Sequence, residues 1–126
     1  MIYSICITCG ALAAGHRSAQ LFCQALLKQG HSINQVFFYQ DAVHMASSLL
    51  SPAQDEYQAQ QAWLDLQAEM PLTVCVAAAI RRGVMDAEQA QRYEKSQHNL
   101  HPQFEIVGLG EFIANAEQAD KQVTFG

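Results

Sequence analysis

The alternation of two kinds of segment constrains the fold of this chain more than any other feature. Short runs rich in aliphatic, β-branched and aromatic residues, typical of strands, alternate with longer segments whose apolar residues recur at helical spacing. The strand-like runs are residues 2–8, 33–39, 72–76, 104–107 and 122–125. Strands that alternate with helices form parallel sheets. The sequence therefore predicts an α/β fold with a five-stranded parallel sheet covered by helices on both faces.

Three helices are indicated by their ends as well as by their apolar spacing. Residues 19–28 carry an apolar stripe, and Gly30 is placed to end that helix. Ser51-Pro52-Ala53-Gln54 has the residues of a helix start, and Trp63 lies on the apolar face of the helix expected to follow. Asp86 is placed to cap a further helix.

The length of 126 residues fits one domain spanning residues 1–126, and 50% apolar residues are enough for a real core. Only 15% of the residues are charged, compared with about 25% in a typical domain. We therefore expect a partner to cover part of the surface, although abundant glutamine also supplies uncharged polar surface.

Charge and hydropathy argue against two classes of partner. The formal net charge is −5 and the seven basic residues are scattered, so no direct nucleic-acid footprint is expected. The chain opens without a basic segment or a small-residue cleavage site, and no apolar run approaches the ~20 residues of a membrane span. We expect a cytoplasmic protein that does not contact a membrane.

Cys75 is the strongest candidate for a chemical role. It lies where the apolar run from Leu72 passes into an Ala-rich segment, so a strand is expected to turn into a helix there. Backbone N–H groups at a helix start favour a thiolate, and strand carboxyl ends are where α/β folds place their sites. Arg81 and Arg82 add positive charge six or seven residues further on. A small core hydrophobe is the alternative interpretation of Cys75.

The other cysteines are expected to be structural. Cys6 and Cys9 form a Cys-x-x-Cys pair, but no second pair completes a zinc site and His16 alone adds little. A redox role for Cys9 is the minority interpretation. Cys23 lies on a helical apolar stripe, and four cysteines in a cytoplasmic chain do not indicate a disulfide scaffold.

Other polar residues give weaker indications. Asp41 and His44 follow the second strand and are expected at the same edge as Cys75, where they can bind a substrate or simply form a turn. His98 and His101 lack acidic neighbours, so no metal site is expected. The segment from Gly108 to Gly110 lacks the third glycine of a dinucleotide fingerprint and predicts only a tight turn, so no cofactor is expected.

Several segments in this order and spacing closely resemble the TusD/DsrE family. They are Val36 to Tyr39 with Asp41 and Val43, Ser51 to Glu56, Ala62-Trp63, Val74 to Ala79, Arg81 to Val84, and Gly108 to Gly110. The resemblance covers nearly the whole chain. It implies a small three-layer α/β/α domain and a cysteine, here Cys75, that carries sulfur as a persulfide. Cys6 and Cys9 depart from the family's usual first strand and inherit no role.

The resemblance also implies partners and a pathway. Subunits of this family assemble with two homologous subunits, TusB-like and TusC-like, into a heterohexamer, take sulfur from a TusA-like carrier and pass it to a TusE-like acceptor. The end product of the Tus route is 2-thiouridine at the tRNA wobble position, whereas the DsrE branch serves sulfur oxidation. Such a relay requires a thiolate and an exposed persulfide, so we expect the Cys75 sulfur to be open to solvent.

Two other functions compete with sulfur relay. A flavodoxin-like module would bind a nucleotide or flavin at the strand ends, but no glycine-rich phosphate loop follows the first strand. A catalytically silent scaffold subunit would keep the fold and the partners without using Cys75.

Overall fold

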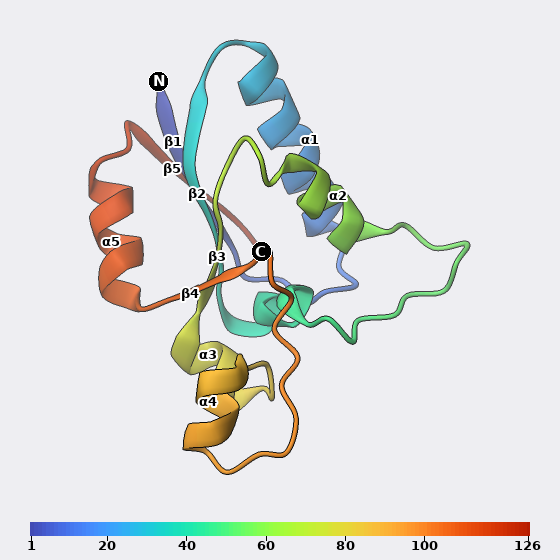
Figure 1. Ribbon diagram of the computed structural model, residues 1–126. Helices are drawn as coiled ribbons and strands as arrows, with labels where there is room; N and C mark the ends of the chain where they lie inside the picture. Colours follow the sequence, from blue (N-terminus) through green and yellow to red (C-terminus); the bar gives the residue numbers. More distant parts are fainter.

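The structure, a computed structural model, describes residues 1–126 and contains one parallel sheet with the strand order β4-β3-β2-β1-β5 (Figure 1). The strands are β1 (Ile2–Ile7), β2 (Ser32–Phe38), β3 (Leu72–Cys75), β4 (Glu105–Val107) and β5 (Lys121–Phe125). Every neighbouring pair is parallel. The predicted α/β fold with five parallel strands is therefore confirmed.

Helices lie on both faces of the sheet, and two more lie beyond one end of it (Figure 1). The first face carries α1 (Gly15–Lys28) and α2 (Ala59–Leu66), and the other carries α5 (Leu109–Glu117). Past the carboxyl ends of the strands lie α3 (Val76–Arg81) and α4 (Ala87–Arg92), together with the 3-10 helix η1 (Gln40–Ala46). This arrangement leaves α5 as the sole helix over its face.

The end of α1 follows from the residues predicted to end it. Gly30 adopts a φ of +87°, which glycine reaches without steric cost. Its N–H bonds to the carbonyl of Leu27, and the N–H of His31 bonds to that of Leu26. These two bonds form a Schellman motif, so the last carbonyls of the helix are satisfied. The cap predicted at Asp86 is also present, because its carboxylate accepts from the N–H of Gln89 at 2.8 Å.

Aromatic side chains fill the layer between the sheet and α2. Trp63 and Phe38 are fully buried with their ring centroids 5.3 Å apart, and Phe104 packs on Phe38 at 5.4 Å. Burial of each such side chain stabilises the fold by roughly 1.5–3 kcal/mol. Trp63 therefore belongs to the core, as its place on the apolar stripe predicted.

The helix expected from Ser51 is not formed, and this prediction is wrong. Residues 51–58 form a loop, and α2 begins at Ala59. Capping residues contribute only about 0.5–2 kcal/mol, and the one large side chain of this segment, Tyr57, is 45% exposed and does not anchor a helix on the core. Tyr57 instead donates its hydroxyl to Gln20 of α1 and lies beneath the Arg17 guanidinium. Contacts with α1 thus hold the segment as a loop.

None of the helices is both long enough and apolar enough to cross a membrane.

Candidate active site

Cys75 lies where the sequence placed it, at the junction of β3 and α3. It is the last residue of β3, and its extended backbone (φ −64°, ψ 119°) leads directly into helix at Val76. On one side Cys75 pairs with Val107 of β4. On the other side the pairing of β3 with β2 ends one residue earlier, at Val74 and Phe38. Cys75 is therefore at the carboxyl edge of the sheet, between two neighbouring strands.

The Cys75 side chain is buried, which corrects the expectation of an open sulfur. The residue is 1% exposed. Thr73 pairs with Phe37, whose ring stacks on Phe112 of α5 at 4.2 Å, so the Thr73 side chain is on the α5 face of the sheet. Side chains two residues apart on a strand point to the same face, and Cys75 is two residues after Thr73. Cys75 thus points to the α5 face, where it is enclosed between β2 and β4. A partner thiol cannot reach this sulfur unless the surrounding chain moves.

The two arginines at the carboxyl end of α3 form no hydrogen bond with the Cys75 thiol. Arg82 donates from Nε to Oδ1 of Asp41 at 2.8 Å and from a terminal nitrogen to the carbonyl of Ala78 at 3.2 Å. Arg81 is exposed and forms no ion pair. Asp41 and Arg82 therefore join η1 to the end of α3, a role that neither residue's sequence context indicated.

The turn that follows α3 is held by Asn99, which the sequence analysis did not single out. Its side chain accepts from the N–H of Met85 at 3.0 Å and donates to the carbonyl of Gly83 at 2.9 Å. Its backbone N–H bonds to the carbonyl of Met85. An asparagine in a loop gives no sequence signal for such contacts, because they join segments that are distant in the chain.

The remaining cysteines have environments that suppress the thiolate. Burial raises the pKa of Cys6 to about 11 and that of Cys23 to about 12. The pKa of Cys9 is also raised by burial, and a hydrogen bond with its own backbone lowers it in part. All four cysteines are free. Cys6 and Cys23 are thus inert thiols in the core, as predicted.

His16 has a structural role that its sequence context did not reveal. The ring is fully buried, and the Trp63 indole N–H donates to Nδ1 at 3.1 Å. Because Nδ1 accepts, Nε2 carries the proton and donates to the carbonyl of Cys9 at 3.1 Å. Burial lowers the pKa of His16, so the ring is neutral. It ties the loop after β1 to α2.

The other candidate polar residues do not converge on Cys75. His44 forms no hydrogen bond with its ring, and His101 accepts from the N–H of Gln103. No group of three or more histidine, cysteine, aspartate or glutamate side chains is arranged to hold a metal ion. Of the two alternatives left open for Asp41, substrate binding and a turn, the structure shows its carboxylate at the turn that follows β2, where it is in an ion pair with Arg82.

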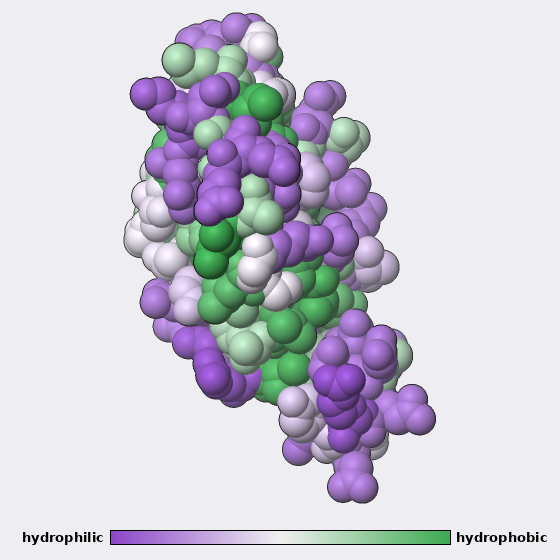
Figure 2. All heavy atoms as spheres, turned by 90° about the vertical axis from the view of Figure 1, so that its left-hand side faces the viewer, coloured by the Kyte–Doolittle hydropathy of each residue, from purple (hydrophilic) through white to green (hydrophobic).

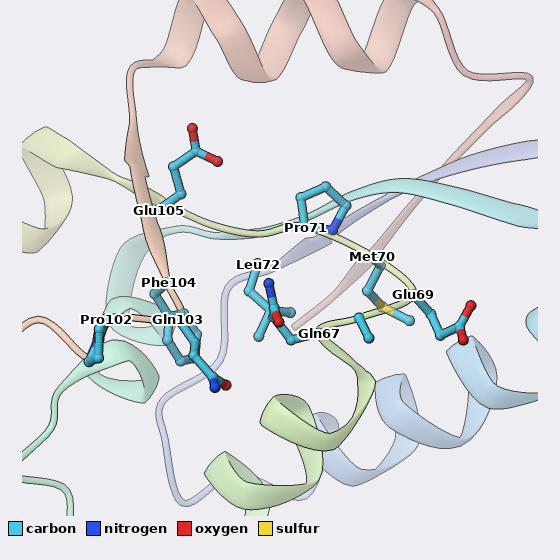
Figure 3. Close-up of a pocket in the computed structure, with 10 residues that line it drawn as sticks. Gln67, Glu69, Met70, Pro71, Leu72, Pro102, Gln103, Phe104 and Glu105 are labelled. Atoms are coloured by element: carbon cyan, nitrogen blue, oxygen red, sulfur yellow. The ribbon is translucent and has the colours of Figure 1, made fainter.

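A surface hollow lies at the opposite end of β3 from Cys75. It is lined by Gln67 to Leu72 and by Pro102 to Glu105, around the amino ends of β3 and β4 (Figure 3). The side chains of Glu69 and Glu105 point outward at its rim (Figure 3). Ligands of open α/β sheets bind at the carboxyl ends of the strands, so this hollow is on the wrong side for the chemistry of Cys75.

Comparison with known proteins decides the family. The DsrE/DsrF-like family model matches residues 1–125. The chain belongs to the DsrE/DsrF-like family. Sulfurtransferase TusD of Proteus mirabilis is 46% identical over 110 residues, which cover 86% of this chain and 85% of that protein. Sulfurtransferase TusD of Salmonella enteritidis is 41% identical over 128 residues, 99% of this chain and all of that protein.

A further relative and one solved structure are also similar to this chain. A DsrE of Allochromatium vinosum is 45% identical over 111 residues, 86% of this chain and 85% of that protein. The crystal structure of the ychN protein from E. coli superposes with a TM-score of 0.74 and covers 98% of this chain and 97% of that one. At 21% identity this last likeness concerns the fold alone.

Proposed function

We propose that this chain is a sulfurtransferase that carries sulfur as a persulfide on Cys75. The observation that carries the proposal is the place of Cys75 at the strand-to-helix junction, on the carboxyl edge of the sheet. The naming of relatives as sulfurtransferases, at 41% and 46% identity, supports the reaction class. Cys6 and Cys23 are poor competitors because their raised pKa values keep them protonated at neutral pH.

The reaction needs only thiol chemistry. The Cys75 thiolate attacks the outer sulfur of a donor persulfide, the donor's S–S bond breaks, and the donor leaves as a thiolate. An acceptor thiolate then attacks the outer sulfur on Cys75, which leaves as a thiolate in turn. Sulfur moves without net oxidation or reduction, so no metal, redox cofactor or further acid–base group is required.

The buried sulfur requires a local opening before either step. α3 is six residues long, and its buried side chains are the small methyls of Ala78 and Ala79. The ion pair that ties its end to Asp41 is on the surface, where such pairs contribute about 0–1 kcal/mol. A short helix with few apolar contacts is a segment of low local stability. We propose that movement of α3 exposes Cys75 to its partners.

The partners and pathway follow from the family. We propose that a TusA-like carrier donates the sulfur and a TusE-like protein accepts it, in the cytoplasm, within an assembly with TusB-like and TusC-like subunits that serves wobble 2-thiouridine synthesis in tRNA. A DsrE-type role in sulfur oxidation is the second candidate. Sequence identity supports this candidate as well, because the chain is 45% identical to the DsrE of Allochromatium vinosum and 46% identical to the TusD of Proteus mirabilis.

Mass spectrometry of single turnovers tests the carrier role. The chain is incubated with a persulfidated TusA-like protein, and we expect one added sulfur atom on the Cys75 peptide that a reductant removes. Cys75→Ser is nearly isosteric and should keep the fold but accept no sulfur. Cys9→Ser is the matched control and should load normally. Sulfur found on Cys9, or continued relay by Cys75→Ser, would show that the chain works differently or is only a scaffold.

The acceptor separates the two pathways. Transfer from loaded Cys75 to a TusE-like protein, followed by thiolated tRNA, supports the tRNA route. Recovery of the chain with sulfite-reductase proteins from native extract, and no transfer toward tRNA, supports sulfur oxidation instead.

A further inference from the structure

The helix α5 has exposed apolar side chains along its length. None of its residues is buried. Leu109 is 44% exposed and Ile113 is 53% exposed, and Glu117 follows them with the same four-residue spacing. Residues spaced by four lie in one row along a helix. These three residues are called the α5 surface below. On the face of the molecule that carries α5, a band of hydrophobic surface runs between hydrophilic borders (Figure 2).

The attachment of α5 to the sheet does not use these side chains. Phe112 stacks on Phe37 of β2 at 4.2 Å, and amide side chains of β2 bond to the backbone of the helix. Gln35 donates to the carbonyl of Phe112 at 3.1 Å, and Asn34 donates to that of Asn115 at 2.7 Å. A helix that is apolar on its outer side as well as its inner side is typical of a helix covered from both sides.

All charged residues of α5 and β4 are acidic. Glu105, Glu111 and Glu117 are exposed, and none is in an ion pair. Glu105 belongs to this face because it pairs with Thr73, which is on the side of Phe37. Glu117 lies in the last turn of α5, where the helix dipole disfavours a carboxylate and no basic residue offsets it. A cation supplied from outside the chain would remove this cost.

We infer that the α5 surface is a docking site for a partner protein that presents apolar side chains flanked by lysine or arginine. A second copy of this chain fits less well, because it would bring two sets of unpaired carboxylates together. The inference deepens the proposed function, on which it rests for the choice of partners to test. The α5 surface and the Cys75 side chain are on the same face of the sheet. A partner bound to the α5 surface is therefore on the face to which the thiol points.

The binding test uses the full chain co-expressed with the TusB-like and TusC-like subunits of the same genome. Ile113→Asp places a charge in the apolar row and should weaken assembly at least about tenfold, as is usual for a central contact. Glu117→Lys should weaken it by a similar factor through repulsion of the partner's cations, and raised salt should weaken the wild-type complex. Leu21→Asp is the matched control, because Leu21 is 58% exposed on α1, on the opposite face, and should leave assembly unchanged.

The remaining outcomes overturn the inference. Wild-type assembly by Ile113→Asp would exclude the α5 surface as the contact. Tighter assembly by Glu117→Lys would exclude a basic partner. Self-association of the isolated chain that Ile113→Asp abolishes, measured by sedimentation, would assign the surface to a second copy. Sulfur loading of Cys75 is measured on the same variants, so a chain that assembles through α5 but never loads sulfur would contradict the proposed function alone.

Discussion

The Arg82 guanidinium donates to the Asp41 carboxylate at 2.8 Å and so joins the far end of α3 to η1, the turn that follows β2. Both residues are at the carboxyl edge of the sheet, one strand apart. Because α3 begins directly after Cys75, this pair restrains the helix whose movement the proposed reaction requires.

Removing this ion pair should increase the reactivity of Cys75. We expect Arg82→Ala to raise the rate of Cys75 alkylation severalfold, because α3 loses its tie to η1, while the free energy of unfolding falls by about 1 kcal/mol or less. The rate is measured by peptide mapping after timed iodoacetamide labelling, and the stability by urea unfolding. Arg81→Ala is the matched control, since Arg81 is exposed and unpaired. Equal labelling rates in both variants would show that the pair does not restrain access to Cys75.

Stability should depend on the protonation of His16. The pKa of His16 is lowered in the folded chain, whereas the unfolded chain binds its proton near the ordinary value of 6.5. Below that value the unfolded state binds more protons than the folded state. The free energy of unfolding is therefore at its full value above about pH 6.5, and it falls as the pH is lowered, by at most about 1.4 kcal/mol per pH unit.

Urea unfolding between pH 7.5 and pH 5 measures this effect. His98→Gln is the control, because His98 is exposed and its loss should leave the pH dependence intact. A stability that stays constant across this range, or that rises as the pH falls, would contradict a buried neutral His16.

The thiols of Cys6 and Cys23 should stay unlabelled in the native chain at pH 8. Their pKa values of about 11 and 12 leave roughly one thiolate per thousand or fewer at that pH. We expect Cys75 to be alkylated before either of them, although it must first be exposed by opening. The order is read by peptide mass spectrometry after labelling for increasing times. Labelling of Cys23 before Cys75 would indicate general unfolding, not opening at α3.

Gly15→Ala should destabilise the chain even though alanine favours helices. A Cβ at Gly15 would lie 2.8 Å from the Cys9 Sγ and 3.1 Å from the carbonyl oxygen of Gly126. Overpacking of this kind costs about 1–3 kcal/mol, more than the ~1 kcal/mol that alanine gains over glycine within a helix. Thermal unfolding measures the difference.

Two comparison variants separate overpacking at Gly15 from other causes. Gly10→Ala meets no atom within 4 Å and should be close to neutral. Cys9→Ala combined with Gly15→Ala should recover part of the loss, because the nearest clashing atom is removed. A double variant no more stable than Gly15→Ala would assign the cost to the backbone at Gly126.

Local sequence determined those features whose causes are local. Apolar runs of the right length identified all five strands, Gly30 ended α1, and Asp86 capped α4. The run into the Ala-rich segment placed Cys75 at the junction of β3 and α3. Each of these features depends on residues that are close together in the sequence, so the sequence pattern alone is sufficient to predict it.

Tertiary structure decided the features that depend on contacts between distant segments. Residues 51–58 stay a loop because Gln20 and Arg17 hold Tyr57, and His16 is neutral because Trp63, 47 positions away, donates to it. Cys75 is buried because parallel pairing encloses the end of β3 between two strands. The pairing of Arg82 with Asp41 is equally non-local. Local propensities amount to a few tenths to about 2 kcal/mol, and packing of this kind outweighs them.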